Sequence, residues 1–456
     1  MIHVDEQYYL LVGDRMLHGA VPYVDLWDRK PVGLFLIYAA MRLLPGDGIL
    51  AYQIVATLFA AATAMLVAKG ARMLGAGRLA ALGAGLAYLV WLPLLSGRGG
   101  QSPVFYNLFM TGAALLTLRL PGLATRRAIV ANGAAACLLA GLAIQTKYTP
   151  FVEGAFFGIV HLRYLRRAGA RWGIVPAALL WIALGVLPTA LVVADFAMRS
   201  RAVFDLFWFS NFGSVQLRRG YPAAKIVGRL SGTWAQLAPL VLCAAVTTQR
   251  VRTPEMRIAL GWLAAGLVGY VMIGAFFDHY ALPLVAPLAI LAAPAFARRP
   301  RVMAAVIAAG MAVLVAKAVL RPNDAAGARA LGRVVAANDA GGCPYVFAGD
   351  SVTYLLAHAC TPTAYAFPSM LAYAPEQGAS GVDEAAEVRR IMAKRPPVVV
   401  TLAVPLAPWN PDTHAIVAAA LARDYRPVFA TPREGTIAVA WLRRDRRFVR
   451  PAAEPR

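Results

Sequence analysis

Long apolar runs limit what this chain can fold into more than any other feature of its sequence. Each of ten runs has 17 or more residues, and about twenty mostly apolar residues span the roughly 30 Å hydrocarbon core of a bilayer as a helix. The chain is 59% hydrophobic and only 15% charged, whereas soluble domains carry about 25% charged residues. We therefore predict an α-helical polytopic membrane protein. The predicted spans are 50–74, 79–96, 104–120, 128–144, 148–164, 173–196, 230–247, 258–276, 281–297 and 302–320.

The net charge of +22, from 45 basic and 23 acidic residues, has two explanations: nucleic-acid binding, or basic turns that set the membrane topology. Every second connection between spans is basic, and together these connections hold sixteen Lys and Arg residues and one acid, Glu255. The short turns on the other side carry only Arg98 and Lys147. The positive-inside rule places the basic turns in the cytoplasm. The charge is therefore topological, and nucleic acid is not an expected partner.

This topology places residues 1–49, 197–229 and 322–456 on the outer side. For a bacterial inner (plasma) membrane that side is the periplasm, and both ends of the given chain would lie there. Residues 33–44 are apolar but too few to span, so we expect an interfacial helix after Pro31. No signal peptide precedes Asp5 and Glu6. We expect one more span upstream of the given start to deliver this outer loop.

After Arg321 the pattern of apolar and polar residues becomes typical of a soluble domain. Predicted strands at 345–348, 398–402 and 437–442 alternate with predicted helices at 325–338, 383–394 and 413–424. This alternation predicts a periplasmic α/β domain over 322–456. The division is thus an outer loop with an interfacial helix (1–49), a transmembrane domain (50–321) and this domain.

Two further features of this domain leave alternatives open. Cys343 and Cys360 can form a disulfide in an oxidising periplasm or remain two buried thiols, since spacing alone does not fix pairing. Gly349-Asp350-Ser351 follows a predicted strand. It lacks the glycines of a dinucleotide fingerprint, so an ordinary strand-to-helix turn with a capping side chain is favoured.

The polar residues that could carry chemistry lie on the outer side. Asp5 or Glu6 can take a proton from a hydroxyl or bind a metal ion; the alternative is a solvated acidic loop. Lys30, just before the interfacial helix, can neutralise a lipid phosphate or simply extend to the interface. Gln101 begins a span, where a polar turn is the simple explanation.

Three more outer segments are cationic or aromatic. Lys147 is a functional candidate near membrane depth, or a local partner of Glu153. Arg218 and Arg219 form the densest basic pair of the connection 197–229, which suggests an anionic partner or plain attraction to lipid. His279-Tyr280 could contact a phosphate or a sugar hydroxyl, or belong to an aromatic interfacial belt.

The motifs of the first loop resemble those of a known family. They are Asp5-Glu6 with Tyr9, then Gly19-Ala20-Val21-Pro22-Tyr23, then Trp27, Lys30-Pro31 and Gly33. This pattern resembles the first outer loop of polytopic type C glycosyltransferases of the family 39 type, akin to protein O-mannosyltransferases and the lipid A aminoarabinose transferase. His279-Tyr280 with the prolines that follow resembles a late segment of the same proteins.

The resemblance implies a sugar donor linked to polyprenyl phosphate, inversion at the sugar, and an acceptor that is an envelope lipid, a polysaccharide or a protein. It implies Asp5 as catalytic base and Glu6 as a supporting acid or metal ligand. Candidates for the donor phosphate or sugar are Lys30, Lys147, Arg218, Arg219, His279 and Tyr280, with Tyr9 and Gln101 as further sugar or acceptor contacts.

Two departures from the family pattern matter. The second outer loop has Gln101-Ser102 where the family commonly has an acid. The sequence therefore requires no cofactor, and the alternatives left open are a site that binds a divalent cation and a site without a metal. The family's first helix is absent from the given chain.

The main alternative function is a transporter or flippase of a lipid-linked or anionic substrate, which would show internal repeats and polar residues at the bilayer midplane. We see no repeat. A non-catalytic scaffold is a third alternative.

Overall fold

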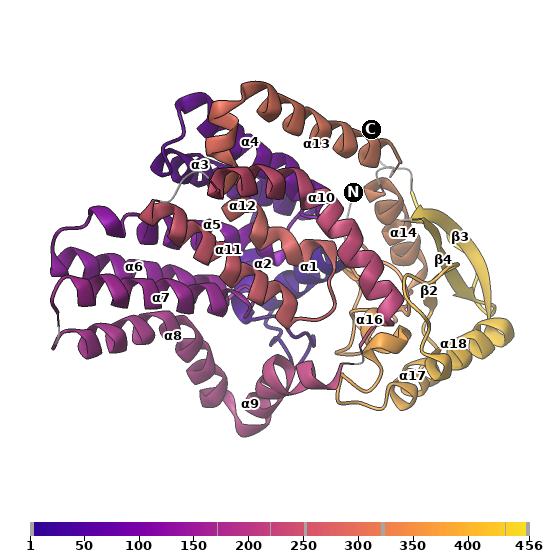
Figure 1. The fold of residues 1–456 in the computed structure, drawn as a ribbon. Helices are drawn as coiled ribbons and strands as arrows, with labels where there is room; N and C mark the ends of the chain where they lie inside the picture. Colours follow the sequence, from indigo (N-terminus) through magenta and orange to yellow (C-terminus); the bar gives the residue numbers. More distant parts are fainter. Residues whose placement is uncertain are drawn as a thin grey trace.

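The computed structural model describes residues 4–170, 172–218, 220–249, 253–320, 324–433 and 435–452. A bundle of long helices makes up most of the molecule, and a small α/β domain built from the C-terminal residues packs at one side of it (Figure 1). The helices α1 (Val4–Leu17) and α2 (Val32–Arg42) lie between the two.

Eight helical stretches in the described part of the chain are long and apolar enough to cross a membrane. Two predicted spans form helices that fall outside this set: α4 (Arg78–Leu94) is short, and α7 (Pro150–Arg167) ends in basic residues. A helix therefore forms at each of the ten predicted positions. The eight stretches are α3 (Ile49–Met73), α5 (Ser102–Leu118) with η1 (Leu120–Gly122), α6 (Arg126–Ile144), α8 (Ile174–Arg199), α10 (Ala223–Thr248), α11 (Pro254–Met272), η4 (Asp278–Ala281) with α12 (Leu282–Arg298), and α13 (Pro300–Leu320).

Threonine side chains explain where two of these helices begin. The Thr125 hydroxyl accepts a hydrogen bond from the Ala128 N–H at the start of α6, and Thr253 does the same for the Met256 N–H at the start of α11. Such caps satisfy N–H groups that have no partner inside the helix. Between α8 and α10, the long connection folds into α9 (Arg201–Trp208), a π-helical turn η2 (Phe209–Gly213) and a 3₁₀ turn η3 (Ser214–Leu217).

The prediction that residues 1–49 form a loop with one helix was wrong, because α1 makes a second helix there. The residues from Glu6 to Asp14 are all buried, since α2 packs on one side of α1 and the C-terminal domain on another. A helix that is buried on all sides has no one-sided apolar pattern, so α1 could not be predicted from the spacing of its apolar residues. The expected helix after Pro31 is present as α2, and its position at the membrane interface stays a prediction.

The C-terminal domain contains the three predicted helices, as α14 (Ala325–Asn338), α17 (Glu384–Ala393) and α18 (Pro411–Asp424). Three short helical turns were not predicted: α15 (Val352–Leu356), α16 (Ser369–Ala372) and η5 (Ala374–Glu376). The sheet has the order β1-β2-β4-β3. Strand β1 (Tyr345–Val346) pairs parallel with β2 (Val398–Leu402), and β4 (Thr436–Arg443) pairs antiparallel with both β2 and β3 (Tyr425–Arg433).

The C-terminal domain is fastened to α1 by buried polar contacts. Gln7 donates from Nε2 to Asp350 Oδ1 at 2.9 Å, and the same carboxylate accepts from Arg433 Nε. Arg433 also pairs with Asp324. Because buried charges are costly unless they are paired, this network fixes the orientation of α1 against the domain. It also gives Asp350 a structural role in a turn, as expected for Gly349-Asp350-Ser351. The expected capping side chain was wrong, because Ser351 at the start of α15 makes no side-chain cap hydrogen bond and the Asp350 carboxylate is used by Gln7 and Arg433.

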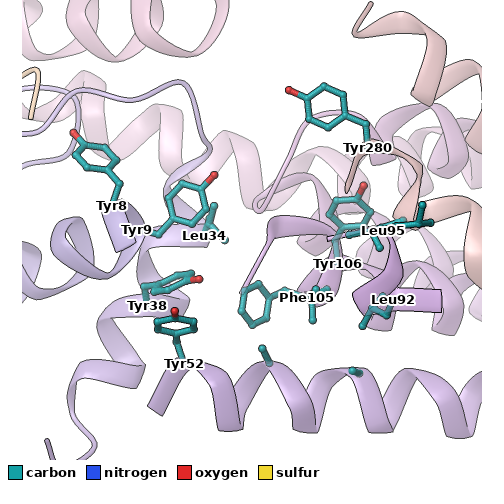
Figure 2. Close-up of a cluster of buried hydrophobic side chains, with 14 of the residues drawn as sticks. Tyr8, Tyr9, Leu34, Tyr38, Tyr52, Leu92, Leu95, Phe105, Tyr106 and Tyr280 are labelled. Carbon is teal, nitrogen blue, oxygen red and sulfur yellow. The ribbon is translucent and has the colours of Figure 1, made fainter. Parts of the chain in front are cut away.

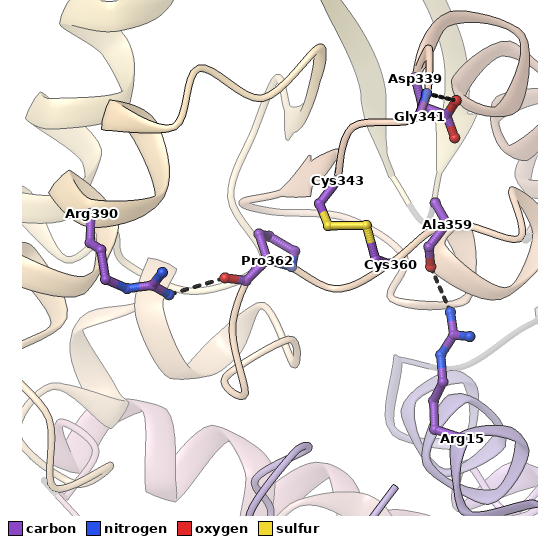
Figure 3. Close-up of a disulfide and its surroundings, with 8 residues drawn as sticks. All are labelled: Arg15, Asp339, Gly341, Cys343, Ala359, Cys360, Pro362 and Arg390. Atoms are coloured by element: carbon purple, nitrogen blue, oxygen red, sulfur yellow. Dashed lines mark hydrogen bonds between the residues drawn. A yellow bond between two sulfur atoms is a disulfide. The ribbon is translucent and has the colours of Figure 1, made fainter. Parts of the chain in front are cut away.

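A disulfide joins Cys343 to Cys360 in the loop that contacts α1 (Figure 3). The carbonyl of Ala359, next to Cys360, accepts a hydrogen bond from Arg15 Nη2 at 2.6 Å. The bridge closes a loop with a sequence separation of 17 residues. It therefore restrains the segment on which the end of α1 rests.

Candidate active site

A cavity of about 460 Å³ lies where the start of α1 meets the C-terminal domain. Its walls come from segments far apart in the sequence: α1, residues 28–30, the residues around the start of α10, the turn η4, and the loops around α16 and η5. The polar side chains among its lining are Asp5, Tyr9, Asp28, Arg29, Lys30, Ser96, Arg218, Tyr221, Lys225, Arg229, Asp278, His279, Tyr280, Ser369, Tyr373 and Glu376.

Helix α1 presents Asp5 and Tyr9 to this cavity. Residues four apart lie on the same face of a helix, whereas Gln7 points toward the C-terminal domain and bonds Asp350. Gln101 donates from Nε2 to Asp5 Oδ2 at 3.2 Å. The Gln101 amide therefore holds the Asp5 carboxylate in place.

The segment after α1 brings cations to the cavity. The backbone N–H of Trp27 donates to the carbonyl of Ala364 at 2.9 Å, and the hydroxyl of Tyr23 donates to the carbonyl of Lys30 at 2.7 Å. These contacts hold the Lys30 ammonium 5.9 Å from the centre of the Tyr9 ring. Lys30 thus lines the same cavity as the candidate base on α1.

Beside Lys30, the Asp28 carboxyl is buried. Burial raises its pKa, while the charge of Lys30 and the N–H of Arg29 act in the opposite direction. Asp28 is therefore a weaker acid than an exposed aspartate, although a cation stands next to it.

Two arginines share one carboxylate in the cavity wall. Arg29 Nη1 donates to Glu376 Oε2 at 2.7 Å, and Arg218 Nη2 donates to Glu376 Oε1 at 2.6 Å. Arg29 comes from the first segment, Arg218 follows η3, and Glu376 belongs to η5 of the C-terminal domain. This bridge ties three parts of the chain together at the site.

The turn η4 supplies His279 and Tyr280. The Lys147 ammonium lies 4.1 Å from the centre of the Tyr280 ring, behind the cavity wall. Burial, and next the nearby charge of Lys30, lower the pKa of Lys147. The Glu153 carboxylate accepts from Trp262 Nε1 at 2.6 Å, so in the described part of the chain Lys147 contacts Tyr280 rather than its possible local partner.

A cluster of buried tyrosines supports Tyr9 from below (Figure 2). The ring of Tyr38 lies 5.5 Å from that of Tyr9 and 5.9 Å from that of Tyr52. The Tyr38 hydroxyl donates to the carbonyl of Gly100 at 2.8 Å, but the buried Tyr9 hydroxyl has no hydrogen-bond partner among the described residues. Burial, and next the charge of Asp5, raise the pKa of Tyr9. Its hydroxyl therefore stays protonated and can donate to a ligand.

The structure gathers most of the predicted site residues at this cavity, although their roles stay predictions. Six of them line it and two touch residues that do: Gln101 contacts Asp5, and Lys147 contacts Tyr280. The exception is Glu6, which is buried against Gly99 outside the lining. Arg219 lies outside the described residues. The six that line the cavity are Asp5, Tyr9, Lys30, Arg218, His279 and Tyr280.

Some lining residues were not assigned a role from the sequence. Arg29 stands within the first-loop motif, but its partner Glu376 is 347 residues away, and no local pattern marks either residue. Lys225 and Arg229 were visible only as part of a basic connection. As to metals, the described residues contain no group of three His, Cys, Asp or Glu side chains that could hold an ion.

The cavity combines one carboxylate that can accept a proton with several cations that can hold an anion. Asp5 is half-buried and kept in place by Gln101. Preorganised cations stabilise negative charge that develops on a leaving group, and charge-assisted hydrogen bonds from guanidinium to phosphate are strong. The arrangement suits displacement of a phosphate by an activated hydroxyl.

Comparison with known proteins places the fold. No protein-family model matches the chain, and no curated protein is significantly similar to it in sequence. Two crystal structures of ArnT from Cupriavidus metallidurans, one bound to undecaprenyl phosphate and one in the apo state, are similar to it with a TM-score of 0.59 each. They are 15% and 16% identical in sequence, and each match covers 95% of this chain and 92% of the ArnT chain. The chain therefore shares a polytopic helical fold with ArnT over nearly its full length.

Proposed function

We propose that the protein is an integral-membrane glycosyltransferase that moves a sugar from a polyprenyl-phosphate-linked donor to an acceptor on the periplasmic side of the inner membrane. One observation carries this proposal: Asp5 on α1, Lys30 in the segment that follows α1, and Arg218 in the connection before α10 line the same cavity. A transporter would need polar residues along a path through the bilayer, whereas these residues gather beside the C-terminal domain.

The proposed reaction is a direct displacement. Asp5 takes the proton of an acceptor hydroxyl, and the acceptor oxygen forms a bond to the anomeric carbon from the face opposite the phosphate. The bond between that carbon and the phosphate oxygen breaks, and the polyprenyl phosphate leaves with the electron pair. Lys30 and Arg218 stabilise the charge on the leaving phosphate. Attack from the opposite face inverts the anomeric configuration.

The other predicted residues have subsidiary roles in this proposal. His279 and Tyr280 contact the donor from η4, and Lys147 supports Tyr280 from behind. The Tyr9 hydroxyl donates to the sugar or to the acceptor, since Tyr9 lines the cavity and its hydroxyl lacks a partner among the described residues. We assign no catalytic contact to Glu6, because its carboxylate lies outside the lining.

The fold supports this proposal. ArnT has a similar structure over nearly the whole chain, and one of its structures holds undecaprenyl phosphate. The first-loop motifs point to the same class of membrane glycosyltransferase. We therefore expect a polyprenyl phosphate to be the lipid carrier for this chain as well.

Purified protein in liposomes tests the proposal. The liposomes are loaded with an extract of polyprenyl-phosphate-linked sugars and with envelope lipids, polysaccharides or proteins as separate acceptor pools. Mass spectrometry of each pool should find a new glycosylated product and free polyprenyl phosphate, and the pool that is modified identifies the acceptor. Movement of lipid-linked sugar across the liposome membrane without any product would instead establish a transporter or flippase.

A further inference from the structure

Glu376 is a buried carboxylate that the C-terminal domain inserts into the cavity wall. Its side chain is 9% exposed, and its two oxygens each accept a hydrogen bond from a different guanidinium, those of Arg29 and Arg218. No other carboxylate of the C-terminal domain lines the cavity among the residues the structure describes. Glu376 thus links this domain to the candidate anion site.

The contacts of Arg29 indicate a structural role. Its Nε donates to Ser214 Oγ at 3.1 Å, its Nη1 to Glu376, and its Nη2 to the carbonyl of Ala379 at 3.0 Å. Its guanidinium also lies 4.8 Å from the centre of the Trp27 ring. A guanidinium has five N–H donors, and in Arg29 three of them, one on each nitrogen, are bonded within the protein. Arg29 therefore holds Glu376 in place rather than the ligand.

The contacts of Arg218 differ. Within the described residues, its only hydrogen bond runs from Nη2 to Glu376 Oε1. Its side chain is 28% exposed and lines the cavity, so its Nε and Nη1 groups remain for a ligand. The residue follows η3 in a connection without regular structure. Glu376 is therefore what fixes the Arg218 side chain at the cavity.

The charges explain why this carboxylate supports an anion site. Two guanidinium groups near each other repel, and the shared carboxylate between Arg29 and Arg218 offsets that repulsion. The three groups together keep one net positive charge. Without the carboxylate, Arg218, which is the more exposed of the two arginines, would turn away from Arg29 toward solvent.

We infer that Glu376 is a positioning residue for the donor phosphate: it holds Arg218 in the cavity, so the anion site is complete only when the C-terminal domain is docked. This inference rests on the proposed function, because it takes the anion to be a polyprenyl phosphate. It gives the C-terminal domain a direct part in donor binding. The opposite possibility is that Glu376 occupies the anion site and competes with the phosphate, and the two predict opposite effects of substitution.

Native mass spectrometry in detergent can measure binding of undecaprenyl phosphate to the full-length protein. This measurement distinguishes a Glu376 that positions Arg218 from a Glu376 that competes with the phosphate. We expect Glu376→Gln to weaken binding by about tenfold, which corresponds to about 1.4 kcal/mol. Glu376→Asp keeps the buried charge but is too short to reach both guanidiniums, and it should also weaken binding. The control Glu387→Gln removes another carboxylate of this domain, bonded to Arg390 away from the cavity, and should bind as the wild type does.

A double-mutant cycle tests whether Glu376 acts through Arg218. Arg218→Gln should weaken binding, and adding Glu376→Gln to that variant should have little further effect. Unchanged or tighter binding by Glu376→Gln or Glu376→Asp, or losses that simply add in the double variant, would overturn the inference. Failure of the wild type to bind undecaprenyl phosphate would instead remove the proposed function, on which the inference rests.

Discussion

Two neighbouring buried tyrosines should respond in opposite ways to the same substitution. The Tyr9 hydroxyl is buried without a hydrogen-bond partner among the described residues, whereas the Tyr38 hydroxyl donates to the carbonyl of Gly100 at 2.8 Å. An unpaired buried polar group costs about 1–3 kcal/mol, and an average hydrogen bond contributes about 1 kcal/mol. Tyr9→Phe should therefore raise the free energy of unfolding by about 1 kcal/mol, and Tyr38→Phe should lower it by about the same amount.

We expect the reverse order for activity: Tyr9→Phe, the more stable variant, should be the less active one. Tyr9 lines the cavity, and we expect Tyr9→Phe to lower kcat/KM by about threefold to tenfold, the equivalent of one lost hydrogen bond to the substrate. Tyr38→Phe should change it far less, because Tyr38 does not line the cavity. Thermal unfolding in detergent without ligand and transfer kinetics with a polyprenyl-phosphate sugar give the two readouts. Destabilisation of Tyr9→Phe equal to that of Tyr38→Phe would refute the reasoning.

Two further predictions concern charge and the disulfide. Because burial and the charge of Lys30 lower the pKa of Lys147, this cation is lost on raising the pH to values still below 10.5, the ordinary value for lysine. Binding of undecaprenyl phosphate by the wild type should decline in that range. Lys147→Arg, which stays charged, should bind to higher pH, and coincident pH profiles would contradict this. Reduction of the Cys343–Cys360 bridge, which closes a loop with a sequence separation of 17, should destabilise the C-terminal domain by about 3 kcal/mol. Thermal unfolding of the protein with and without reductant measures it, and an unchanged midpoint would show that the bridge adds no stability.

The bundle could be predicted from the sequence because span length and charge asymmetry are local signals. A helix forms at all ten expected positions, although α4 and α7 are not long and apolar enough to be assigned as spans by themselves. Helix α1 was missed because it is buried on every side. Strand β3 was missed because it contains Pro427 and Pro432. Proline is tolerated at the edge of a sheet, and β3 is an edge strand.

Some of the residues that line the cavity could be picked out from the sequence for the same reason. Asp5, Lys30 and Arg218 attract notice because acids and cations are unusual beside apolar spans. Glu376 has no such context, since it lies in a soluble domain where an acidic residue is ordinary. Its importance comes from its contact with Arg29, 347 residues away in the chain. Only folding brings these residues together, so this contact cannot be predicted from a local sequence pattern.

Transfer of sugar by Asp5→Asn, measured beside its binding of undecaprenyl phosphate, tests the central claim most directly. Asparagine preserves the size of the side chain and can still contact Gln101, but it cannot take a proton. We predict that this variant is inserted in the membrane and binds undecaprenyl phosphate as the wild type does, while transfer from the polyprenyl-phosphate donor falls by about a hundredfold or more. Transfer at the wild-type rate by a variant that binds the lipid normally would contradict the assignment of Asp5 as the base.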